Sequence, residues 1–123
     1  MKLENIKFKA KRLDNREWVE GDLMKESYSA RIIEHTSKAD NWVSVDPSTV
    51  CQFTGLKDCE GNEIWEGDII SSPHFERVAT VKWDDSLCGF KCSDVTGNIN
   101  FCFTAIAHCS EWSIVGNKFD KKK

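Results

Sequence analysis

The chain contains 123 residues, of which 40% are hydrophobic and 30% charged, and its formal net charge is −3. This size and composition are typical of one globular domain and exclude a disordered chain. No apolar run approaches the roughly 20 residues that span a membrane, and no apolar signal segment follows Met1. We therefore expect a single domain over residues 1–123 that lies in the cytoplasm and does not contact a membrane.

The charge is unevenly distributed along the chain. Residues 1–40 hold nine Lys and Arg against eight Asp and Glu, whereas residues 41–116 hold four against eleven. The last seven residues are basic, with four Lys and one Asp. Because the main body is acidic, a broad phosphate-binding surface is not expected, and nucleic acid is not the favoured partner.

Alternating residues predict a hairpin at the N-terminal end, over residues 4–24. Its first strand is predicted where apolar and basic residues alternate, with Ile6, Phe8 and Ala10 against Lys7, Lys9 and Lys11. A turn at Asp14-Asn15 leads into the second apolar segment, residues 17–23.

The middle of the chain is less regular. Residues 30–35 are a candidate strand, residues 36–41 have the composition of an exposed loop, and residues 25–44 as a whole stay open between strand, helix and loop. Asp46-Pro47 has the form of a helix start, with room for about one turn. Residues 58–62 form a predicted turn.

Strand patterns dominate the second half. They cover residues 64–71, 77–83, 88–92, 99–103 and 111–116, with a hairpin loop at 84–86. The segment 77–83 places Ala79, Val81 and Trp83 on one face. Residues 104–109 are a candidate short helix, and residues 118–123 are predicted to be a flexible tail. The fold class is therefore mainly β.

One long segment carries a family resemblance. Residues 45–70, VDPSTVCQFTGLKDCEGNEIWEGDII, resemble the central signature of the YopX family, which runs T-V-x-Q-(F/Y)-T-G-L-x-D-x-x-G-x-x-I-(Y/F/W)-E-G-D-I-(I/V). Residues 6–10 with 17–19 resemble the family's N-terminal hairpin, and residues 111–117 resemble its W-x-(V/I)-(I/V)-G-N element. The chain departs from the pattern at residues 118–120.

The resemblance implies a small, partly closed, antiparallel barrel-like domain with one or two short helical turns. It also implies a bacteriophage or prophage setting. It implies no activity, since fold does not fix function.

The signature contributes the candidate turn residues Thr54, Gly55, Asp58, Gly61, Glu66, Gly67 and Asp68. On a strand, Glu66 and Asp68 would project from one face about 7 Å apart, as paired carboxylates for acid–base work require. The alternative is a turn or bulge in which Gly67 leads the chain into the next strand. We favour the structural interpretation.

Six cysteines invite a metal or thiol hypothesis, namely Cys51, Cys59, Cys88, Cys92, Cys102 and Cys109. They include no C-x-x-C, and on one strand Cys88 and Cys92 would lie about 13 Å apart, too far to share a zinc ion. A nucleophile built from His108-Cys109, or from His35 or His74 with a thiol, has no identifiable orienting group. We expect six free thiols, no metal, no cofactor and no catalytic residue.

The candidate interaction residues are Trp18, Trp65, Lys7, Lys9 and Lys11. A lysine row beside an aromatic residue suits single-stranded nucleic acid, whereas the alternative is a solvated strand that resists edge pairing. We predict a non-enzymatic binding or assembly module that forms a homo-oligomer and contacts a phage or host protein. A nucleic-acid-associated accessory protein is the second hypothesis. A carboxylate- or metal-dependent hydrolase using Glu66, Asp68, Asp84 or Asp85 is the third.

Overall fold

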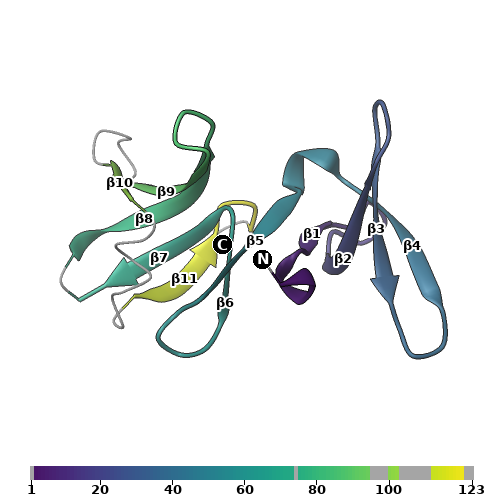
Figure 1. Cartoon of the computed structure of the whole chain (residues 1–123), viewed down its shortest axis with the longest axis horizontal. Helices are drawn as coiled ribbons and strands as arrows, with labels where there is room; N and C mark the ends of the chain where they lie inside the picture. Colours follow the sequence, from purple (N-terminus) through teal and green to yellow (C-terminus); the bar gives the residue numbers. More distant parts are fainter. Residues whose placement is uncertain (1, 74, 95–99, 103–111, 121–123) are drawn as a thin grey trace. The chain divides into compact units, whose positions relative to one another are not determined.

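A computed structural model describes residues 2–73, 75–94, 100–102 and 112–120. The described residues form strands joined by turns, with two short 3-10 turns (Figure 1). The candidate helix at 104–109 lies outside them. The elements are η1 (Leu3–Asn5), β1 (Phe8–Lys11), β2 (Trp18–Lys25), β3 (Ala30–His35), β4 (Asp40–Val45), η2 (Pro47–Thr49), β5 (Cys51–Lys57), β6 (Glu63–Trp65), β7 (Asp68–Ser72), β8 (Phe75–Asp84), β9 (Gly89–Asp94), β10 (Asn100–Cys102) and β11 (Ser113–Asn117).

The chain forms two compact units, Met1–Phe53 and Thr54–Lys123. Strand β5 begins in the first unit and ends in the second. Each strand pair is antiparallel. The expectation of a mainly β chain with short helical turns is therefore confirmed. In the described residues, no helix has the length and apolar character needed to cross a membrane.

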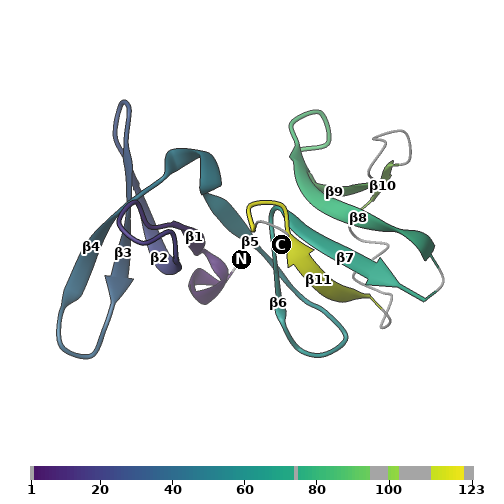
Figure 2. The same ribbon diagram turned by 180° about the vertical axis from the view of Figure 1, so that it is seen from behind.

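In the first unit the strands follow the order β4-β3-β2-β1-β5, so that the two long hairpins β2–β3 and β3–β4 stand beside β1 (Figures 1 and 2). The sheet curls until β4 meets the end of β1. The Asp46 N–H donates to the Lys11 carbonyl at 2.9 Å, and the Leu13 N–H donates to the Ser44 carbonyl at 3.1 Å. The bridge between Arg12 and Val45 lies between these two bonds. This partial closure agrees with the barrel-like expectation.

The core of this unit lies on the inner side of the curl. It consists of residues that are at most 5% exposed, namely Ala10, Val19, Ala30, Ile32 and Val45. Strands β2 and β3 approach each other closely at Gly21. A Cβ added to Gly21 would lie 2.0 Å from the Ile33 carbonyl oxygen, so only a glycine fits at this position.

The sequence prediction of a loop over residues 36–41 is wrong at its end. The turn between β3 and β4 is short, since the Thr36 N–H donates to the Ala39 carbonyl, and β4 already begins at Asp40. The strand was missed because its first three residues, Asp40, Asn41 and Trp42, are all exposed and so show no alternation. The expected helix start at Asp46 is confirmed as one 3-10 turn, in which the Asp46 carboxylate accepts a bond from the Ser48 N–H.

In the second unit the main sheet has the order β10-β9-β8-β7-β11, and β6 runs beside the end of β5 (Figure 1). Its core contains Ile64, Ile70, Ala79, Val81, Cys92 and Trp112. Trp83, which the alternation placed with Ala79 and Val81, is 45% exposed and packs edge-on against Phe90. Cys88 is not in β9, because it adopts a positive φ of 50° in the preceding turn.

Candidate binding surface

The predicted lysine row lies on the outer face of β1, opposite the core residue Ala10. Because antiparallel partners share a face, the pairing of Lys11 with Trp18 puts the indole on the same face as the lysines. The Lys9 ammonium lies 4.6 Å, and the Lys11 ammonium 4.8 Å, from the centre of a Trp18 ring. We call Lys7, Lys9, Lys11 and Trp18 the basic–aromatic face.

Each of these contacts is a cation–π interaction, worth about 0.5–1 kcal/mol at an exposed site. Trp18 is only partly buried. The partly exposed indole therefore has two ammonium groups over its rings. Glu20 is paired with Lys9 on the same face, so the charge is mixed rather than uniformly basic. Lys7 differs from the other two, since it lies over the ring of the buried residue Phe53 at 4.8 Å.

A second tryptophan–cation pair lies on the outer side of β3 and β4, where sequence analysis proposed no site. The Arg31 guanidinium lies 5.2 Å from the Trp42 ring, and Trp42 is 50% exposed. Arg31 is also ion-paired with Glu26. The exposure of Trp42 could have been predicted from the apolar residues Val43 and Val45. Because Val43 and Val45 point inward, Trp42 lies on the opposite face of the strand.

His35 forms the most polar cluster of the first unit. Its Nε2 lies 2.6 Å from the Asp22 carboxylate and its Nδ1 lies 2.7 Å from the Asp40 carboxylate. The hydrogen bond with Asp22, followed by the one with Asp40, raises the pKa of His35 above its ordinary value. Because these side chains come from three different strands, no short sequence motif predicts the cluster.

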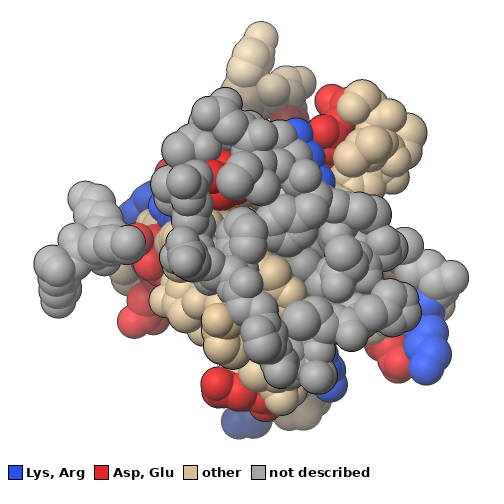
Figure 3. All heavy atoms as spheres, turned by 90° about the vertical axis from the view of Figure 1, so that its left-hand side faces the viewer, with Lys and Arg blue, Asp and Glu red and all other residues tan. Residues whose placement is uncertain are grey.

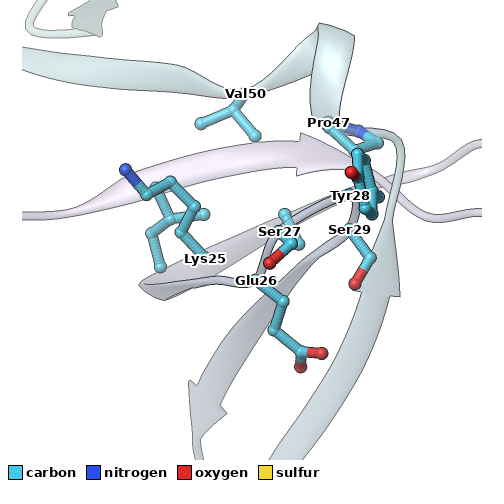
Figure 4. Close-up of a pocket in the computed structure, with 9 residues that line it drawn as sticks. Lys25, Glu26, Ser27, Tyr28, Ser29, Pro47 and Val50 are labelled. Carbon is cyan, nitrogen blue, oxygen red and sulfur yellow. The ribbon is translucent and has the colours of Figure 1, made fainter.

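An apolar hollow of about 400 Å³ lies between the β2–β3 hairpin and η2. Figure 4 shows residues 25–29 along the hairpin, with Val50 and Pro47 above them in this view. Tyr28 at the hairpin tip is 99% exposed. The first unit thus carries exposed aromatic rings at Tyr28 and Trp42 as well as the partly buried Trp18.

Trp65, the other candidate interaction residue, is only 4% exposed. Its backbone N–H donates to the Asp68 carboxylate at 2.7 Å. Asp68 is 3% exposed and also accepts a bond from the Asn117 amide at 2.9 Å. Trp65 therefore belongs to the interior of the second unit and is not part of the basic–aromatic face.

Of the remaining predicted turn residues, Thr54 and Gly55 lie within β5 rather than in a turn, whereas Asp58 holds a turn. Thr54 Oγ1 donates to the Ile64 carbonyl at 2.6 Å, and Gly55 lies inside β5. Asp58 accepts bonds from the N–H groups of Glu60, Asn62 and Ile114. Burial opposes the ionisation of Asp58, but these backbone hydrogen bonds outweigh it and hold the pKa below its usual range.

Gly61 and Gly67 both have positive φ, of 85° and 88°. The Gly67 N–H donates to the Val81 carbonyl, and its carbonyl accepts a bond from the Lys118 N–H. The turn at 66–67 separates β6 from β7, so Glu66 and Asp68 do not share one strand as the paired-carboxylate hypothesis required. The hydrogen bond to the Gly67 carbonyl also fixes the backbone of Lys118, which is the first residue of the predicted flexible tail.

The carboxylates of the predicted hydrolase that lie near β8 have local partners. Asp84 accepts hydrogen bonds from Ser86 and is ion-paired with Lys91 at 2.9 Å, and these contacts hold its pKa far below the ordinary value. Asp85 accepts a bond from the Trp83 indole N–H at 2.6 Å. Both residues stabilise the β8–β9 turn.

The four cysteines that the structure describes are free thiols. Cys51 and Cys92 are buried, whereas Cys59 and Cys88 are exposed. The side chains of Cys102 and Cys109, and the residues His74 and His108, lie outside the described part of the chain. Within that part, no three His, Cys, Asp or Glu side chains are arranged to hold a metal ion.

Charge is distributed without a dominant sign on the face that Figure 3 shows. Among the described residues of that face, acidic and basic side chains occupy separate, interspersed places. Among the described side chains that this view shows, no continuous basic track is visible.

A protein-family model described as "YopX protein" matches residues 7–122 of the 123-residue chain. No curated protein matches the chain.

Proposed function

The chain belongs to the YopX protein family, and on that premise we propose that it is a non-enzymatic binding or assembly module of a bacteriophage or prophage. It acts through protein contacts in the cytoplasm of the host cell. The basic–aromatic face carries this function, and the observation that supports it is the placement of the Lys9 and Lys11 ammonium groups over the Trp18 indole.

Such a group suits a protein interface for two physical reasons. Tryptophan is enriched among the residues that dominate binding energy, because it buries a large area with few rotatable bonds. The lysines hold the Trp18 ring in one orientation before a partner arrives, which reduces the entropy lost on binding.

The partner at this face is a second copy of the chain. In a symmetric dimer the same patch meets itself, and the opposite charges of Lys9 and Glu20 then allow cross-subunit pairing. Trp18 loses its remaining solvent contact when the dimer forms.

Multi-angle light scattering tests this assembly. A homo-oligomer is expected at ~100 μM protein, together with its dissociation on dilution. Trp18→Ala is expected to weaken association while the β-sheet circular dichroism is unchanged. Trp83→Ala is the matched control, because Trp83 is an exposed tryptophan of the other unit. A monomeric mass at that concentration contradicts the proposal.

Nucleic-acid association is the second candidate, favoured by the row of three lysines beside an indole. It predicts retention of single-stranded DNA or RNA that weakens steeply with salt and with Lys9→Ala. Protein binding ranks above it because Glu20 shares the face and residues 41–116 are acidic. Sub-micromolar binding of nucleic acid that survives ~0.2 M salt would reverse this order.

A further inference from the structure

We propose that the outer edge of β4 binds an extended segment of a partner protein as an added antiparallel strand. An apolar side chain of that segment enters a hollow between Leu13 and Trp42. This surface is distinct from the basic–aromatic face. The inference rests on the proposed function only in one respect, namely that the chain is a binding module.

The backbone of β4 presents hydrogen-bonding groups to this edge. On the side away from β3, the Ser44 carbonyl accepts a bond from the Leu13 N–H, and the Asp46 N–H donates to the Lys11 carbonyl. Groups two residues apart point the same way along a strand, so those of Trp42 and Asp40 point to this side too. Within the described part of the chain, no strand pairs with Asp40 or Trp42 on that side.

The protein itself already adds a strand to the same edge. Residues 12–13 run antiparallel beside Ser44–Asp46, and the chain then turns away. The turn is fixed by Arg16, which has a φ of 61° and donates its N–H to the Arg12 carbonyl. Residues 12–13 thus pair with the end of β4 only. In the described part of the chain, residues 40–43 have no strand partner on the same side, and we call them the β4 edge.

A hollow beside the β4 edge supplies a place for a side chain. Its volume is about 260 Å³, and it is lined by Arg12, Leu13, Asp14, Trp42, Val43 and Ser44. Leu13 is 59% exposed and Trp42 is 50% exposed. Alternate side chains of an added strand point to one face, so one apolar residue of the segment reaches this hollow while its backbone pairs with β4.

The charges around the edge indicate a basic segment. Asp22 and Asp40 share the single imidazole of His35, so the Asp40 end of the edge carries excess negative charge even when His35 is protonated. Arg12 and Asp14, which line the hollow, form an ion pair with each other at 2.8 Å and so offset one another. A Lys or Arg of the segment that lies near Asp40 would complement this negative charge.

The strand lacks the usual protection against such pairing. Edge strands are commonly blocked by proline or lysine, and β4 contains neither in its sequence DNWVSV. A second copy fits this edge less well than a partner segment. Self-pairing would use only the outward groups of Asp40 and Trp42 and would bring the negatively charged Asp40 ends of two copies together.

Selection from a displayed library of random seven-residue peptides tests the proposal. Enrichment of peptides with an apolar residue flanked by Lys or Arg is expected on the wild-type protein. Trp42→Pro is expected to weaken their binding about tenfold or more, because it removes an edge N–H that β3 does not use. Trp42→Ala keeps that N–H and should weaken binding less, and Trp18→Ala should leave it unchanged.

Hydrogen exchange of the backbone amides gives a second measure that does not depend on the variants. Binding of an enriched peptide should slow exchange at Trp42 and leave Asn41 and Val43, which pair with β3, as slow as before. The same peptide with N-methyl groups at alternate positions should lose affinity. Equal binding by the methylated peptide contradicts strand addition, even where Trp42→Pro does not fold.

Three other results would overturn the proposal. One is a library that yields no enriched peptide, and another is binding that survives Trp42→Pro in a folded protein. The third is self-association that Trp42→Pro abolishes, since that assigns the edge to a second copy. Failure of the Trp18 assembly leaves peptide binding at the β4 edge unaffected, so the two proposals can fail separately.

Discussion

Asp58 accepts a hydrogen bond from the backbone N–H of Ile114, a residue that follows it by 56 positions. The same carboxylate also accepts the N–H groups of Glu60 and Asn62 at 2.9 and 2.8 Å. A single buried side chain therefore fixes both a local turn and the start of β11.

Asp58→Ala is expected to lower the free energy of unfolding by about 2–3 kcal/mol, because three backbone donors lose their acceptor. Urea denaturation measures this change. Glu60→Ala is the control, since it removes an exposed acid from the same turn and should change stability by less than about 0.5 kcal/mol. Equal effects of the two substitutions would show that Asp58 has no special role.

The cluster of Asp22, His35 and Asp40 makes stability depend on pH. The raised pKa of His35 means that protonated His35 is favoured in the folded chain. This contribution is fully present below the ordinary pKa of 6.5 and is lost as pH rises through the higher folded value. The melting temperature of the wild type should therefore fall relative to that of His35→Asn as the pH rises above 6.5.

A direct titration of His35 by NMR provides the check on this interpretation. The midpoint should lie above 6.5 in the folded protein. In Asp22→Asn the midpoint should move down, since the largest contact that favours the charged ring is lost. A difference in melting temperature that does not change with pH would contradict the proposed cause.

Gly21→Ala should destabilise the first unit severely, since the new Cβ would overlap the Ile33 carbonyl oxygen at 2.0 Å. A backbone atom cannot move aside as a flexible side chain does. Gly116→Ala is the matched control, because no atom lies within 4 Å of the position of its added Cβ. Thermal unfolding measures the stability of the two variants, and similar melting temperatures would contradict the close approach of β2 and β3 at Gly21.

The described thiols should differ sharply in reactivity. Cys59 and Cys88 are exposed and should react quickly with a thiol reagent in the native protein, whereas the buried Cys51 and Cys92 should react only after unfolding. Cys59→Ser and Cys88→Ser should each remove one fast-reacting thiol, and Cys51→Ser should remove none. Denatured, unreduced protein should yield six thiols, and a count of two or four would contradict the expectation of free cysteines.

Regular alternation made much of the fold predictable. Ala10 is buried between outward lysines, and Ala79 and Val81 are buried on one face of β8, as their period of two indicates. The start of strand β4 was not predicted from alternation, because Asp40, Asn41 and Trp42 are all exposed. An edge strand with few buried neighbours leaves little hydrophobic pattern in its sequence.

The surface residues were harder to predict than the strands. The lysine row and Trp18 were visible from local spacing, and the register of β1 with β2 brings them together. The His35 cluster and the Arg31–Trp42 pair depend on how β2, β3 and β4 align, which no short segment encodes. Trp65 was ambiguous because a turn rather than a continuous strand follows it.

The curl that joins β4 to the end of β1 sets the order in which the first unit folds. Hairpins β1–β2, β2–β3 and β3–β4 each connect neighbouring segments, whereas the bond from the Lys11 N–H to Thr49 Oγ1 joins residues 38 positions apart. Contacts distant in sequence carry a larger loop-closure cost and form late. Removing this contact with Thr49→Val should therefore speed unfolding and leave the refolding rate nearly unchanged, so that the contact between β1 and η2, the turn that directly follows β4, governs the lifetime of the native unit.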